Sequence, residues 1–130
     1  MRIFKVKGFA RFQRRERIAE EVLVKAVQDA GAGLVDADLG GGLIKQRVAR
    51  RGQGKSGGYR AVIAFRRGQR AVFLYGFAKS DLTNIDDDEL ETLRVRGRAF
   101  LALKEEQLAA LTAGGELLEV SYVEIEQDEG

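Results

Sequence analysis

The chain of 130 residues contains no cysteine, no histidine and no proline. Without cysteine it can form neither a disulfide nor a thiolate metal site. Without histidine it lacks the commonest general acid–base group and the commonest metal ligand, so any catalysis must use other side chains. Since proline is absent, we expect the 16 glycines to end the helices and strands.

Long apolar runs are also missing. No segment approaches the roughly 20 consecutive apolar residues that a membrane-spanning helix needs. The basic start of the chain, residues 1–7, contains no apolar segment of the kind found in signal peptides. We therefore expect a cytoplasmic protein, and the length is that of one domain able to bury a core without disulfides or metals.

Acidic residues are absent from one long stretch. Residues 39–79 carry ten Lys or Arg side chains and not one Asp or Glu. Residues 81–130 carry only four basic residues against fourteen acidic ones, so the overall charge of +2 conceals a cationic centre and an anionic tail. This asymmetry indicates a polyanion-binding face. Solvated charge on an ordinary surface is the alternative, although ordinary surfaces mix the two signs.

Apolar periodicity predicts a single α+β domain. The glycine-rich residues 31–42 are predicted to be a connection, and a polar cap residue, Asn84 or Asp86, is predicted to start a helix. Lys45 and Arg47, two positions apart on a strand, are expected to share one face. The expected strands are residues 2–7, 43–49, 59–65, 71–77 and 117–125, and the expected helices are residues 9–17, 18–30, 87–103 and 104–111.

Residues 52–57, Gly-Gln-Gly-Lys-Ser-Gly, bear only a partial likeness to a nucleotide-binding P-loop. That motif requires a glycine where this chain has Ala49, and a helix where this chain has two glycines and a strand pattern. We therefore reject ATP or GTP binding and expect no cofactor. The glycines instead allow backbone amides to approach a phosphate, with Lys55 as a point charge. An ordinary hairpin loop is the open alternative.

Basic side chains on the face of a sheet suit a phosphodiester backbone, because each neutralised phosphate releases counterions. Tyr59 and Tyr75 could stack on bases, as aromatic side chains do in single-stranded RNA sites. Both tyrosines alternate with residues that could equally face the core, so core packing is the alternative for each. The residues predicted to bind RNA are Arg50, Arg51, Lys55, Tyr59 and Arg70.

Three segments resemble the RelE/HigB-like toxins of bacterial type II toxin–antitoxin systems, in the RelE/ParE superfamily. They are residues 42–50, residues 52–60 with Gly-Gly-Tyr-Arg at their end, and residues 75–79, Tyr-Gly-Phe-Ala-Lys. The resemblance spans residues 1–103, which it implies are the toxin domain, with residues 104–130 as an acidic C-terminal helical extension. It implies a RelE-like, microbial-RNase-like antiparallel sheet with the N-terminal helices packed on one face.

The resemblance also implies an activity and partners. RelE-like toxins are mRNA interferases, metal-independent endoribonucleases that usually cut mRNA on the ribosome, inhibit translation and are neutralised by a cognate antitoxin. By matching position, Arg60 corresponds to the arginine that contacts the scissile phosphate. Lys45 and Arg47 correspond to the paired basic residues that hold and activate the substrate, and Lys79 to the basic residue that closes the site.

The match to the family pattern has two gaps. The best-studied members carry an arginine where this chain has Ser80, and a tyrosine near the start of the next helix, where it has Ile85 and Asp86. The general base is therefore unassigned, and a lysine crowded by like charges is one possibility.

Two other functions stay open at this point. The same cationic sheet would serve a non-catalytic module that binds RNA or an antitoxin, and the superfamily also contains ParE-like inhibitors of DNA gyrase. Lys45, Arg47 and Arg60 favour the nuclease, since a gyrase inhibitor needs no cluster that activates a phosphate. The acidic residues 105–130 could shield the basic face in cis or form a solvated tail.

Overall fold

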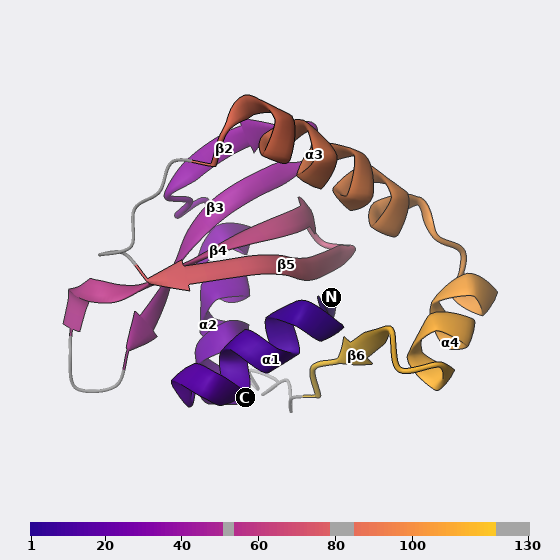
Figure 1. The fold of residues 1–130 in the computed structure, drawn as a ribbon, viewed down its shortest axis with the longest axis horizontal. Helices are drawn as coiled ribbons and strands as arrows, with labels where there is room; N and C mark the ends of the chain where they lie inside the picture. Colours follow the sequence, from indigo (N-terminus) through magenta and orange to yellow (C-terminus); the bar gives the residue numbers. More distant parts are fainter. Residues whose placement is uncertain (51–53, 79–84, 122–130) are drawn as a thin grey trace, which may run out of the picture.

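The computed structural model of the protein describes residues 1–50, 54–78 and 85–121, with the side chains of residues 50 and 54–57 left out. The described part confirms the predicted α+β class, with four helices and six strands (Figure 1). In chain order the elements are β1 (Arg2–Val6), α1 (Lys7–Glu16), α2 (Glu20–Gly31), β2 (Ala37–Gly40), β3 (Leu43–Arg50), β4 (Gly54–Arg66), β5 (Arg70–Ala78), α3 (Asp87–Ala102), α4 (Glu105–Ala113) and β6 (Leu117–Glu119).

The strands form one sheet in the order β2-β3-β4-β5-β1-β6. The pairs β2–β3, β3–β4, β4–β5 and β1–β6 are antiparallel, whereas β1 and β5 are parallel. The sheet is therefore mixed, and the expectation of a wholly antiparallel sheet is corrected. Parallel neighbours need a long crossover, and all the elements from α1 to β4 lie between β1 and β5 in the chain.

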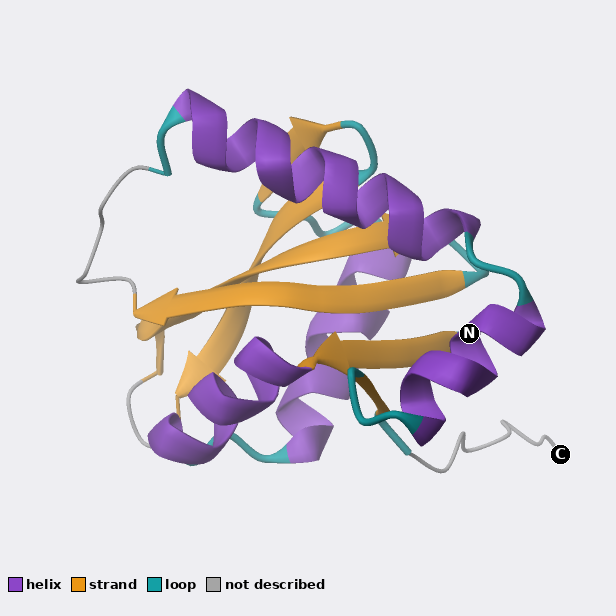
Figure 2. Ribbon diagram, turned by 45° about the vertical axis from the view of Figure 1, so that its right-hand side comes forward, coloured by secondary structure: helices purple, strands orange, loops and turns teal. Residues whose placement is uncertain are grey.

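Helices cover both faces of the central strands. The N-terminal helices α1 and α2 pack on one face, as predicted, and α3 lies across the other (Figure 2). A Cβ atom added to Gly76 of β5 would lie 2.4 Å from Cε2 of Phe12 in α1. A Cβ atom added to Gly97 of α3 would lie 2.9 Å from Cδ2 of Leu43 in β3. These close approaches show that α1 covers one face of the central strands and α3 the other, and they explain why most residues of β5 are apolar.

The segment predicted to be a connection contains the edge strand β2. The turn that joins β2 to β3 is made by residues 40–42, three glycines with φ of +83°, +63° and +85°, which L side chains rarely adopt. Arg94 of α3 donates to the carbonyl oxygen of Leu39 from both Nε (3.0 Å) and Nη2 (2.7 Å). Helix α3 therefore holds the β2–β3 turn in place.

Asp86 starts α3, as one of the two predicted caps. Its Oδ1 accepts from the Glu89 backbone N–H (2.8 Å), and Glu89 Oε1 accepts from the Asp86 backbone N–H (3.3 Å). The two residues thus form a capping box, which satisfies two backbone donors that a helix start leaves unpaired.

Asp86→Ala is expected to lower the free energy of unfolding by about 1 kcal/mol, the usual cost of losing an N-cap side chain. Urea denaturation measures the effect. Asp88→Ala is the matched control, because it removes a negative charge from the same helical turn without touching the cap. Equal losses in the two variants would assign the effect to charge near the helix start and not to the cap.

The C-terminal segment completes the sheet at the edge far from β2. Strand β6 pairs with β1, and Glu119 accepts a hydrogen bond from Arg2 Nε at 2.9 Å, which lowers the pKa of the Glu119 carboxyl below its ordinary value. Leu108 of α4 and Leu117 of β6 are buried in the core. The described part of the acidic extension therefore packs at the edge of the sheet opposite β2, and the rest of the segment expected to shield the basic face, residues 122–130, lies outside the described residues. In the described part of the chain, none of the helices has the length and apolar character of a membrane span.

Candidate active site

Three cations project from the same face of two neighbouring strands. Arg47 of β3 and Arg60 of β4 are register partners, so their side chains lie on one side of the sheet. Lys45, two residues before Arg47, shares that side. The structure thus brings together three of the four predicted catalytic residues. Like charges placed opposite each other across a sheet are destabilising, so this arrangement needs a counter-charge.

Asp36 supplies that counter-charge. Its Oδ2 lies 3.4 Å from Arg60 Nε and 3.8 Å from Lys45 Nζ, and its Oδ1 lies 3.5 Å from Arg47 Nε. Among the described residues, no other Asp or Glu lies within ion-pair distance of these three cations. One carboxylate thus faces three positive charges, and the cluster keeps a positive surplus that can bind an anion. We refer to Asp36, Lys45, Arg47 and Arg60 as the Asp36 cluster.

The contacts in the Asp36 cluster leave hydrogen-bonding capacity unused. The three distances exceed the usual 2.7–3.2 Å of an N–H···O hydrogen bond. Arg60 also donates from Nη1 to the backbone oxygen of Tyr59 at 3.2 Å, which fixes its guanidinium. The Arg60 side chain is 10% exposed and that of Arg47 is 58% exposed. Arg60 therefore lies at the bottom of the site. Arg47 lies at its exposed edge, where its donors can turn to a phosphate.

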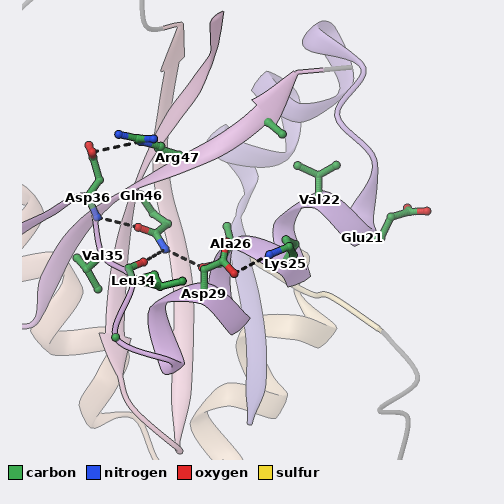
Figure 3. Close-up of a pocket in the computed structure, with 12 residues that line it drawn as sticks. Glu21, Val22, Lys25, Ala26, Asp29, Leu34, Val35, Asp36, Gln46 and Arg47 are labelled. Atoms are coloured by element: carbon green, nitrogen blue, oxygen red, sulfur yellow. Dashed lines mark hydrogen bonds and ion pairs between the residues drawn. The ribbon is translucent and has the colours of Figure 1, made fainter. Parts of the chain in front are cut away.

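Gln46 fixes the position of Asp36 (Figure 3). The buried Gln46 side chain accepts at Oε1 from the Asp36 backbone N–H (3.0 Å). Its Nε2 donates to the backbone oxygens of Ala26 in α2 (3.0 Å) and Leu34 in the following loop (2.8 Å). One amide thus joins α2, the loop and β3. The backbone of Asp36 is exposed, but its side chain is only 18% exposed because the loop turns it toward the cations.

A groove of about 670 Å³ runs between α2 and β3 beside the Asp36 cluster. Asp36 and Arg47 contribute to its lining together with the apolar side chains of Val22, Leu34 and Val35 (Figure 3). Its volume falls within the range of small-molecule pockets. An apolar wall next to a positively charged cluster complements a nucleotide, which joins a flat base to an anion.

The ring of Tyr59 is not exposed to solvent, so the prediction that Tyr59 binds RNA is corrected. It is buried, its ring meets that of Phe12 edge-on at a centroid distance of 5.5 Å, and its hydroxyl donates to Glu16 Oε1 at 2.9 Å. Tyr75 is the exposed tyrosine of the sheet, at 45%. It lies beside Phe77, whose register partner is Arg60, so this aromatic pair adjoins the Asp36 cluster.

Arg70, which was predicted to bind RNA, has a structural role in the protein itself. Its Nη1 donates to the backbone oxygens of Phe100 (2.7 Å), Leu101 (3.3 Å) and Leu103 (3.0 Å). A guanidinium at the C-terminal end of a helix satisfies unpaired carbonyls and opposes the helix dipole. Arg70 therefore ties the start of β5 to the end of α3.

Four of the predicted site residues cannot be placed. Lys79 and Arg51 lie outside the described residues, and the side chains of Arg50 and Lys55 are not described. Their roles in closing the site and binding RNA stay predictions. Within the described residues, no group of three Asp or Glu side chains is arranged to hold a metal ion.

Comparison with known proteins adds one finding to this geometry. The family model of the RelE toxin of the RelE/RelB toxin–antitoxin system matches residues 1–120. The match extends past residue 103, so it includes α4 and β6 as well as the central strands. No curated protein matched the sequence.

Proposed function

Because the chain belongs to the family of RelE toxins, and is therefore a toxin that pairs with an antitoxin, we propose that it is an endoribonuclease that cuts mRNA on the translating ribosome. The observation that supports the nuclease is the convergence of Lys45, Arg47 and Arg60 on one face of the sheet. A toxin directed at DNA gyrase would not need such a cluster. The proposal requires no metal, because side chains supply the positive charge.

In the proposed reaction, the scissile phosphate binds among these three cations. The 2′-hydroxyl of the preceding ribose attacks the phosphorus, and the negative charge that develops on the phosphate oxygens is stabilised by guanidinium and ammonium groups already in position. The fixed guanidinium of Arg60 suits two-point contact with phosphate oxygens, and Lys45 acts as a mobile point charge. The products are a 2′,3′-cyclic phosphate and a 5′-hydroxyl end.

Tyr75 is proposed as the platform for a base of the bound RNA. Tyr75→Ala is expected to weaken the binding of a short single-stranded 2′-O-methyl RNA, which cannot be cleaved, by about 1–2 kcal/mol, the usual contribution of one stacked base. Fluorescence anisotropy measures this change. Tyr75→Phe keeps the ring and is expected to bind like the wild type; equal weakening in both variants would assign the effect to the hydroxyl.

The function itself is tested in cells induced for the wild-type protein, with translation running or blocked, by following growth and mapping mRNA 5′ ends. The proposal predicts growth arrest and new 5′ ends that need ongoing translation, both suppressed by the cognate antitoxin. If a folded, expressed protein produces no new 5′ ends, the nuclease proposal is wrong. Loss of DNA supercoiling in those cells would indicate a gyrase inhibitor, and the absence of both effects a binding module.

A further inference from the structure

The proposed nuclease lacks an assigned general base. A lysine could take this role if like charges crowded it. In the structure, however, Lys45 Nζ has the Asp36 carboxylate at 3.8 Å. The crowding that this role requires is therefore relieved by an opposite charge, and a different group must accept the 2′-hydroxyl proton.

We propose that Asp36 is the general base, which removes the proton from the attacking 2′-hydroxyl. The role rests on the proposed ribonuclease function, and it is carried by the position of the carboxylate among the cations that would bind the phosphate. The attacking oxygen must come within about 3–3.5 Å of the phosphorus. A base within reach of that oxygen therefore has to lie next to the phosphate site, as Asp36 does.

The surroundings of Asp36 keep its carboxylate in place without using up its oxygens. Its backbone N–H is held by Gln46 at 3.0 Å, whereas its side chain lies 3.4–3.8 Å from the cations. A phosphate bound to Lys45 and Arg47, the more exposed cations, would draw them away from the carboxylate while Arg60 stays in place. An oxygen of Asp36 then becomes free to accept a proton while the backbone anchor stays unchanged.

The charged groups facing Asp36 come from two neighbouring strands. Lys45 and Arg47 belong to β3 and Arg60 to β4. On the α2 side of the groove, Lys25 is paired with Asp29 at 2.7 Å. Lys45 is the proton donor in this scheme, so the acid and the base of the reaction both belong to the Asp36 cluster.

The step balances without an oxidant, a reductant or another reactant. As the 2′-oxygen forms a bond to phosphorus, its proton passes to an Asp36 carboxylate oxygen. The bond between phosphorus and the 5′-oxygen breaks, and the 5′-oxygen takes a proton from the Lys45 ammonium. Water then removes the proton from Asp36 and returns one to Lys45, which restores both groups.

A purely electrostatic role for Asp36 makes different predictions. If the carboxylate only offsets repulsion among the cations, its neutralisation would strengthen RNA binding and leave cleavage unchanged. If it blocked the phosphate site, its neutralisation would speed cleavage. As the general base, its loss instead slows the chemical step, to which general acid–base catalysis contributes about a hundredfold or more.

The test is single-turnover cleavage of mRNA on programmed ribosomes by the full chain, comparing the wild type with Asp36→Asn and Asp38→Asn. Asp38 accepts from the Gly40 backbone N–H at 2.9 Å and is not an ion-pair partner of the described cluster cations, so Asp38→Asn is a matched loss of charge. Asp36→Asn is expected to lower the maximal cleavage rate about a hundredfold or more, with unchanged or tighter binding. Asp38→Asn is expected to cleave at the wild-type rate.

Each result separates the role of Asp36 from the proposed function. Absence of cleavage by the wild type contradicts the nuclease and with it any base. Cleavage by the wild type and by a folded Asp36→Asn variant at similar rates contradicts only the role of Asp36, as does faster cleavage by the variant.

The pH dependence of the wild-type rate provides a test that no folding defect can affect. Carboxylates are ionised throughout the range from about pH 6 to 9, whereas lysines lose their protons toward its upper end. A carboxylate base predicts a rate that does not rise across this range. A rate that increases about tenfold per pH unit above pH 7 would identify a lysine as the base and overturn the assignment.

Discussion

Arg60→Ala is expected to reduce ribosome-dependent mRNA cleavage between about a hundredfold and a thousandfold, the loss seen when one preorganised donor to a developing negative charge is removed. The reason is its place in the structure. Arg60 is the least exposed cation of the Asp36 cluster, and its guanidinium is fixed by a hydrogen bond to the backbone oxygen of Tyr59 and lies 3.4 Å from Asp36. Water that replaced this side chain could not supply the same fixed positive charge.

Two further variants separate position from charge. Arg67→Ala removes an arginine from the same basic stretch, but from the exposed turn between β4 and β5, and it should cleave normally. Arg60→Lys keeps the charge and loses the planar fork of donors, so it should fall between the alanine variant and the wild type. Rates are measured in single turnover, after circular dichroism has established that each variant is folded. An Arg60→Ala protein that cleaves at the wild-type rate would refute the assignment.

The strands that carry the site could be predicted from the sequence, whereas the edges of the sheet could not. Alternation along β3 and β4 placed Lys45 and Arg47 on one face and separated Tyr59 from Arg60. Strand β2 has only four residues, too few for its short alternation to predict a strand, and it forms because it pairs with β3. The parallel pairing of β1 with β5 joins segments far apart in the chain, which local periodicity does not report.

Asp36 was missed because its role depends on tertiary contacts. It stands in a glycine-rich segment that resembles a simple connection, and only the fold brings it to Lys45, Arg47 and Arg60. One feature of the sequence pointed to it. Gln46 lies between Ile44 and Val48 on the apolar side of β3, and a buried glutamine needs polar partners.

The contacts of two residues predicted to bind RNA could not be read from the sequence for a similar reason. Alternation showed that Tyr59 and Arg60 face opposite sides of β4, but it could not show that α1 covers the side of Tyr59. A register shift after Val62 in the pairing with β5 then helps to place Tyr75 on the side of Arg60. Arg70 contacts carbonyls about thirty residues later in the chain, a partner that its local sequence does not indicate.

Gln46→Leu is expected to lower the free energy of unfolding by about 3 kcal/mol, because leaving a buried polar group without its hydrogen bond costs about 1–3 kcal/mol. Leucine has a similar volume, but it can neither accept from the Asp36 N–H nor donate to the backbone oxygens of Ala26 and Leu34. Urea denaturation measures the loss. Gln28→Leu, at an exposed position of α2, is the matched control and should change stability little.

The same substitution tests whether Gln46 matters for catalysis as well as for stability. It keeps every side chain of the Asp36 cluster but frees the loop that carries the carboxylate, and a misplacement of about 1 Å can cost a hundredfold in rate. We therefore expect cleavage by Gln46→Leu to fall by more than its folded fraction at the assay temperature. Cleavage that falls only in proportion to the folded fraction would limit Gln46 to stability. A combined Asp36→Asn and Gln46→Leu variant that cleaves no more slowly than Asp36→Asn alone would show that Gln46 acts through Asp36, since residues that act as one unit are not additive.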